Sequence, residues 1–122
     1  DLSSNSLTGS TPSSLTKLQN LEYLGLYYNS LSGRIPKELG KLSALRYLAL
    51  DGNDLHGELP KELGNLTNLR ALAVSGNYLS GPIPDYIGKW VNLSDLVLIG
   101  NNFSGNLPAE TFSLTKLEKL YV

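Results

Sequence analysis

The chain has 122 residues, enough for one domain, and 41% of them are hydrophobic, which is sufficient for a continuous core. Ten basic and eleven acidic residues give a formal net charge of −1, so the charge gives no reason to expect binding to nucleic acid. The chain has no cysteine, which excludes disulfides, thiolate metal sites and a cysteine nucleophile.

An asparagine recurs every 24 residues along the whole chain, at Asn5, Asn29, Asn53, Asn77 and Asn101. Counted from each asparagine, an apolar residue follows at plus two, a glycine at plus four and a proline at plus seven. Further apolar positions recur at plus thirteen, sixteen, nineteen and twenty-one. A constant period of this kind is typical of stacked coils. We therefore interpret residues 1–122 as a single solenoid segment of about five repeats.

Each coil is predicted to contain one short strand, around plus nineteen to twenty-one. Coils spaced by about 4.8 Å would pair these strands into a parallel sheet along one side of the stack. One coil buries only about seven apolar side chains, worth roughly 1.5–3 kcal/mol each. Ordering its backbone costs about 1–2 kcal/mol per residue, so a single coil cannot fold alone. The recurring asparagine is expected to bond backbone groups of its own and neighbouring coils, as a structural ladder.

Two stretches of the repeat resemble a known family. Residues 45–55 read Leu-x-x-Leu-x-Leu-x-x-Asn-x-Leu, the signature of the leucine-rich repeat. Residues 29–40 read Asn-x-Leu-x-Gly-x-Ile-Pro-x-x-Leu-Gly, which resembles the plant-specific subclass. The resemblance implies an α/β repeat fold, a leucine-rich repeat solenoid with a parallel β-sheet on the concave face and a 3-10 or irregular convex side. Residues 81–90 look most like receptor kinases whose ectodomains join such repeats to a malectin-like domain.

The two ends of the sequence both fall inside predicted strands, and neither has the atypical repeat that caps a solenoid. In plant relatives the caps usually carry cysteine pairs, so the absence of cysteine fits an internal segment with caps missing at both ends. Exposed apolar edges lead us to expect that the segment alone aggregates or fails to express.

The sequence shows no arrangement of side chains for catalysis. His56, the single histidine, has no partner close in sequence and is interpreted as a surface residue. Glu38 and Glu62 each follow a lysine, which favours a solvated convex face, whereas Trp90 occupies a leucine position and is expected in the core. We expect no enzyme activity, cofactor or metal in this chain; any kinase activity would lie in a domain outside it.

Side chains at plus eighteen, twenty and twenty-two are predicted to face the concave solvent side, and they vary between coils. Four tyrosines converge there: Tyr23, Tyr27, Tyr28 and Tyr47. The small residues Gly25 and Ala49 beside them are expected to leave room in front of the sheet. Tyrosine has a rigid apolar ring and a polar tip, which suits peptide or sugar ligands. The alternative is that β propensity alone places tyrosine on an exposed strand.

Charged and polar residues complete the predicted ligand-binding surface. Arg46 and Arg70 share plus seventeen on consecutive coils and are candidates for a ligand carboxylate, with ion pairing to Glu22 as the alternative. The other predicted ligand-binding residues on this face are Asp51, Ser75, Asp95 and Ile99.

The resemblance implies an extracellular recognition module, a segment of a plant receptor-like kinase ectodomain that binds a peptide, glycan or protein ligand and a co-receptor ectodomain. The alternative is a soluble secreted protein of the polygalacturonase-inhibitor type. Ice binding is a third hypothesis, because the plus-three positions are hydroxyl-rich apart from His56, although the mixed side chains of the concave positions argue against it. Glycosylation sequons at Asn65, Asn92 and Asn102 support passage through the secretory pathway. No apolar run approaches the roughly 20 residues that span a bilayer, so we expect no direct membrane insertion by this segment.

Overall fold

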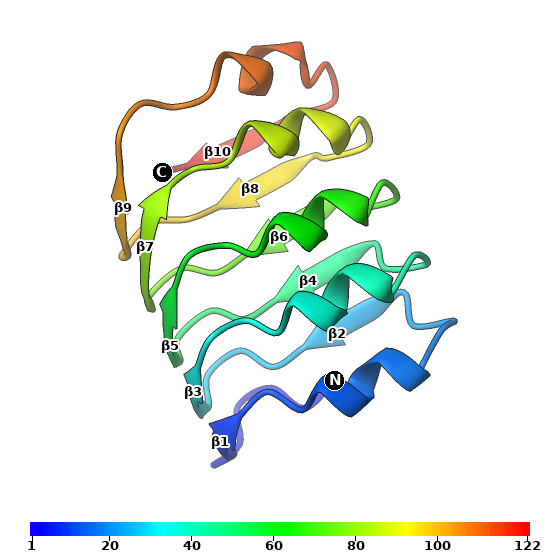
Figure 1. Cartoon of the computed structure of the whole chain (residues 1–122), viewed down its shortest axis with the longest axis vertical. Coiled ribbons are helices and arrows are strands. Elements are labelled where there is room, and N and C mark those ends of the chain that lie inside the picture. The colour runs from blue at the N-terminus through cyan, green and yellow to red at the C-terminus, as the bar shows by residue number, and fades with distance from the viewer.

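The computed structural model describes all 122 residues, which form a curved stack of coils (Figure 1). One sheet runs along the concave side and contains the predicted strands. Its members are β2 (Tyr23–Gly25), β4 (Tyr47–Ala49), β6 (Ala71–Ala73), β8 (Asp95–Val97) and β10 (Lys119–Tyr121). They are parallel and adjacent in the order β10-β8-β6-β4-β2. Each residue lies opposite its counterpart one repeat later, as Leu48 does opposite Leu72. The 24-residue period is therefore the register of this sheet.

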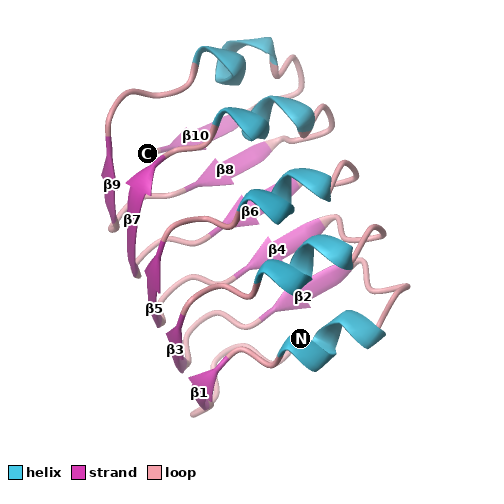
Figure 2. Cartoon of the chain, viewed as in Figure 1, coloured by secondary structure: helices cyan, strands magenta, loops and turns pink.

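A second parallel sheet, here called the lateral sheet, runs along one side of the stack (Figure 2). Its strands are β1 (Thr8–Ser10), β3 (Ser30–Gly33), β5 (Asp54–Gly57), β7 (Tyr78–Pro82) and β9 (Asn102–Ser104). In β3 the apolar residue Leu31 is buried while Ser30 and Ser32 are exposed. This second sheet was not predicted from the sequence.

The glycine at plus four lies in or directly after each lateral strand and has a positive φ, between 79° at Gly9 and 85° at Gly57. A left-handed backbone is strained for residues with a Cβ, which explains glycine at this position. The proline at plus seven then stands directly before a short 3-10 helix. These helices are η1 (Ser13–Lys17), η2 (Lys37–Lys41), η3 (Lys61–Asn65), η4 (Asp85–Lys89) and η5 (Ala109–Ser113). The predicted 3-10 convex side is thereby confirmed.

The inward side chains form one core of 24 buried hydrophobic residues. Trp90 is fully buried within it, as its leucine position predicted, and its Nε1 donates a hydrogen bond to the Leu63 carbonyl oxygen at 3.0 Å. The core therefore accepts an indole ring at a leucine position because the indole N–H finds a backbone partner. The helices are 3-10 turns of five residues each, and none could span a bilayer.

The asparagine ladder has the predicted role. Asn53 is only 5% exposed, and its Nδ2 donates to the carbonyl oxygens of Leu26 and Leu50, both at 3.0 Å. Its Oδ1 accepts from the backbone N–H of Leu31 at 2.9 Å. Asn77 repeats the pattern one coil later. Asn53 and Asn77 thus each join their own coil to the preceding one.

Candidate functional site

The four predicted tyrosines lie together at the concave face, and we call them the tyrosine patch: Tyr23, Tyr27, Tyr28 and Tyr47. The pairing of β2 with β4 places Tyr23 opposite Tyr47, with ring centroids 6.2 Å apart. Tyr27 and Tyr28 follow β2 and form an edge-to-face pair with centroids 5.6 Å apart. Burial raises the pKa of Tyr23, and the neighbouring Tyr27 and the Asp51 carboxylate raise it further. The Tyr23 hydroxyl is therefore neutral at physiological pH and able to donate a hydrogen bond.

The space in front of Gly25 is not open, contrary to the expectation from its small size. A Cβ added to Gly25 would lie 2.7 Å from a ring carbon of Tyr23 and 2.9 Å from its hydroxyl oxygen. The carboxylate of Asp1 is equally close, at 2.7 Å. Because Gly25 has no side chain, the Tyr23 ring lies over the strand and fills the room that the glycine provides.

Tyr28 has an unusual backbone for its residue type. Its φ is +53°, in the left-handed region, and its side chain is 65% exposed. The same position is held by Gly52, Gly76 and Gly100 in later coils, all with positive φ, and by Ser4 in the coil before. The Tyr28 ring covers Gly52, where an added Cβ would lie 2.6 Å from a ring carbon. An exposed tyrosine is thus maintained where the backbone favours glycine, at a cost of about 1–2 kcal/mol.

The two predicted arginines differ in their surroundings. Arg46 forms an ion pair with Glu22, with a nitrogen–oxygen distance of 3.5 Å, so the ion-pairing alternative is confirmed for this residue. Arg70 is exposed and its guanidinium makes no ion pair. The backbone carbonyl of Arg70 accepts a hydrogen bond from the Ser94 N–H at 2.8 Å. Arg70 is therefore the one free guanidinium of the predicted pair.

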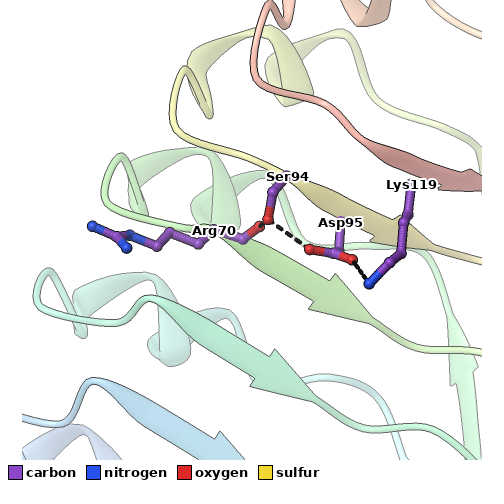
Figure 3. A network of polar contacts seen from close by, with 4 residues as sticks. All are labelled: Arg70, Ser94, Asp95 and Lys119. Atoms are coloured by element: carbon purple, nitrogen blue, oxygen red, sulfur yellow. Dashed lines mark hydrogen bonds and ion pairs between the residues drawn. The ribbon is translucent and has the colours of Figure 1, made fainter.

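Asp95 belongs to a polar network on the C-terminal coils (Figure 3). Lys119 Nζ lies 2.8 Å from its carboxylate, and Ser94 Oγ lies 2.6 Å from it. The hydrogen bond from Lys119 is the main cause that lowers the pKa of Asp95, followed by the bond from Ser94. The carboxylate is thus engaged within the sheet and not presented with the tyrosine patch.

The remaining residues predicted on this face are the polar Asp51 and Ser75 and the apolar Ile99. Asp51 accepts from the backbone N–H of Ser75 at 2.9 Å and from its hydroxyl at 2.5 Å. Ile99 is 47% exposed. Asp51 and Ser75 therefore join two coils, and only Asp51 is close enough to the tyrosine patch to affect Tyr23.

A polar pocket of about 390 Å³, here called the edge pocket, lies where the chain enters the concave strands. It is lined by Tyr47, Arg70, Asn92, Ser94, Lys116 and Glu118. It brings together two predicted ligand-binding residues, Tyr47 and Arg70. Lys116 and Glu118 were not predicted, although they share the plus-fifteen and plus-seventeen positions with Asn92 and Arg70.

A larger groove of about 620 Å³ lies between the lateral sheet and the 3-10 helices, away from the predicted site. It is lined by prolines of the plus-seven position, by Arg34 and Glu58, by two lysine–glutamate pairs and by Tyr86. Glu38 and Glu62 line this groove and are half-buried, so they are only partly exposed on the predicted solvated face. Tyr86 donates its hydroxyl to the Pro60 carbonyl oxygen at 2.9 Å, and burial is the main cause that raises its pKa.

The remaining predicted positions lie apart from the concave face. His56 is exposed on β5 of the lateral sheet. Asn65 ends η3 and Asn102 begins β9, and both are exposed. Of the three sequon asparagines, only Asn92 lines the edge pocket.

Comparison with known proteins decides the family. A family model described as a leucine-rich repeat region matches residues 1–122. The chain belongs to the leucine-rich repeat family. No curated protein matches the leucine-rich repeat chain closely enough to be informative.

Solved structures place this leucine-rich repeat chain with plant receptors. The TDR receptor is 42% identical with a TM-score of 0.95, over 97% of this chain and 20% of its own. The plant peptide hormone receptor RGFR1, solved with RGF2, is 39% identical with a TM-score of 0.98, over 100% of this chain and 20% of its own. The Arabidopsis receptor kinase HAESA, solved with the peptide hormone IDA and the co-receptor SERK1, is 37% identical with a TM-score of 0.94. That match covers 96% of this chain and 20% of HAESA.

The chain thus spans about a fifth of the length of these receptors. Its repeats are of the type found in plant leucine-rich repeat receptors, as the residue pattern predicted.

Proposed function

We propose that this segment recognises a peptide ligand through the tyrosine patch, as part of an extracellular plant receptor ectodomain. The observation that carries the proposal is Tyr28, an exposed tyrosine kept at a left-handed position that later coils fill with glycine. Backbone strain of this kind is concentrated at functional sites. Stability alone would favour glycine there, so the tyrosine side chain is needed for something other than the fold.

The chemistry of the patch suits a peptide. The paired rings of Tyr23 and Tyr47 offer a rigid apolar surface with polar tips, which loses little conformational entropy on binding. Tyr47 also lines the edge pocket beside the unpaired guanidinium of Arg70. An apolar peptide side chain on the rings and a peptide carboxylate at Arg70 would satisfy both features. RGFR1 and HAESA are each solved with a peptide hormone, which supports a peptide as the ligand class.

The same proposal includes a co-receptor ectodomain as a second partner, because the HAESA structure contains the co-receptor SERK1. It also places the protein at the cell surface, in agreement with the three sequons. The malectin-containing subfamily stays a prediction from residues 81–90.

The proposal is tested with the receptor ectodomain that contains this segment and a displayed library of random peptides. Enriched peptides are measured by calorimetry on the unaltered protein and on a Tyr23→Ala, Tyr27→Ala, Tyr47→Ala variant. Aromatic hot-spot residues typically contribute about 2 kcal/mol or more each, so we expect affinity to fall by at least about 30-fold.

Tyr78→Ala is the matched control, because Tyr78 is 63% exposed but lies on the lateral sheet. It should leave the affinity unchanged. Equal binding by the triple variant, with an intact circular dichroism spectrum, would reject the tyrosine patch as the site.

A further inference from the structure

Asn92 and Asn68 occupy the same position in consecutive coils but use their side chains differently. Asn68 donates its Nδ2 to the Ser43 carbonyl oxygen at 2.9 Å and so binds the preceding coil. Asn92 uses only its Oδ1, which accepts from Lys116 Nζ at 2.6 Å. Its Nδ2 has no hydrogen-bond partner, and this is the atom to which an N-linked sugar is attached. Asn92 begins the sequon Asn92-Leu93-Ser94, whereas Asn68 begins none.

The position of Asn92 gives this sequon a consequence that the other two lack. Asn92 lines the edge pocket together with Tyr47 and Arg70. A sugar attached to Asn92 Nδ2 begins at the wall of that pocket. Its hydroxyl and N-acetyl oxygens would find donors in the unpaired guanidinium of Arg70 and in Lys116 Nζ. Sugars on Asn65 or Asn102 would begin on the convex and lateral sides instead.

We propose that an N-linked glycan on Asn92 occupies the edge pocket and excludes other ligands from Arg70 and Tyr47. Modification joins Nδ2 to the anomeric carbon of an oligosaccharide carried on a lipid pyrophosphate; the amide loses one proton and the lipid pyrophosphate leaves. Occupancy of this one sequon then sets the fraction of molecules whose pocket is open. The biological effect rests on the proposed function, whereas the shielding of Arg70 does not.

The test uses the receptor ectodomain secreted from plant cells, with phenylglyoxal as the probe because it modifies accessible guanidinium groups. Glycopeptide mass spectrometry first measures the occupancy of Asn92. The rate of modification at Arg70 is then compared with that at Arg34, which is exposed, lines the groove between the lateral sheet and the 3-10 helices, and serves as an internal reference. We expect Arg70 to react several-fold more slowly in the glycosylated protein than in Asn92→Gln.

Asn102→Gln is the matched control, because it removes a sequon on the lateral sheet and should leave the Arg70 rate unchanged. Ser94→Ala removes the same sequon while keeping Asn92, and should give the same faster labelling if Asn92→Gln folds poorly. An unmodified Asn92 in the secreted protein, or equal Arg70 rates with and without the glycan, would overturn the proposal. If Arg70 is shielded but peptide affinity is unchanged by the tyrosine substitutions, the glycan proposal stands and the proposed function is rejected.

Discussion

Replacement of Asn53 by alanine tests how the ladder holds the coils together. Asn53 bonds four backbone groups, but the loss is smaller than their number suggests. The Leu26 carbonyl oxygen also accepts from Asn29, and the Leu50 carbonyl oxygen also accepts from Asn77, so both keep a partner. The Asp51 carbonyl oxygen keeps the bond from the Tyr28 N–H. Only the backbone N–H of Leu31 loses its acceptor. One buried donor without a partner costs about 1–3 kcal/mol, which is the expected loss of unfolding free energy for Asn53→Ala.

Asn5→Ala provides the comparison for this prediction. Asn5 is exposed and donates only within its own coil, to the carbonyl oxygens of Leu2 and Ser3. The Leu2 oxygen keeps a bond from Asn29, so the expected change is within about 0.5 kcal/mol. Urea unfolding followed by circular dichroism measures both variants as shifts of midpoint at constant slope. Equal shifts for Asn53→Ala and Asn5→Ala, or no shift for Asn53→Ala, would refute the assigned role of the inter-coil bonds.

Three further predictions concern packing, backbone strain and charge. Gly40→Ala should destabilise by about 1–3 kcal/mol in urea unfolding, because its Cβ would lie 2.2 Å from a backbone oxygen of the next coil. Gly64→Ala, whose Cβ would lie no closer than 3.1 Å to side-chain atoms of Tyr86, should change stability by less than about 1 kcal/mol; the reverse order would contradict this packing. Tyr28→Gly should raise the melting temperature, because it removes about 1–2 kcal/mol of backbone strain at the left-handed position. A lower melting temperature would contradict this strain. Asp95 has a folded pKa below its unfolded value of about 3.9, so its contribution is present above that pH and is lost as pH falls through the folded pKa. Unfolding between about pH 5 and pH 2 should therefore show a smaller acid loss for Lys119→Met than for the unaltered protein, and equal losses would show that Lys119 is not the cause.

The concave sheet was predictable because its register equals the sequence period. The spacing of the asparagines alone places Leu48 opposite Leu72, and the structure has that pairing. Trp90 was predictable for the same reason, since a position that is leucine in other coils must face inward. Because every coil follows the same residue pattern, a single sequence shows that pattern several times independently.

The lateral sheet was missed although its signal was present. Residues 30–33 alternate polar, apolar, polar and glycine, which is the two-residue period of a half-buried strand. Four residues are too few to distinguish a strand from a turn, and only the repetition in each coil makes the pattern meaningful. The position of Tyr28 was missed similarly, because it was considered with the other tyrosines and not with Gly52, Gly76 and Gly100.

The parts of the candidate site that the sequence did not reveal depend on side-chain contacts between coils. The spacing indicated ion pairing with Glu22 for both arginines, but not that Arg46 would form the pair while Arg70 stays free, since both occupy the same position in their coils. The filling of the space at Gly25 by the Tyr23 ring likewise depends on the direction of one side chain. The period predicts which residues are neighbours, but not which of them bond.

In this fold, a residue that differs from those at the same repeat position in other coils carries the most information about function. The same residue recurs at a repeat position where successive coils meet the same physical need. Examples are the left-handed backbone at Gly52 and the close approach of the next coil at Gly40. A departure is therefore either tolerated at a cost or maintained for another purpose. Tyr28 departs from the glycines that hold its position in later coils and bears a cost in backbone strain. It lies beside the concave face, which is the physical reason for assigning recognition to that surface.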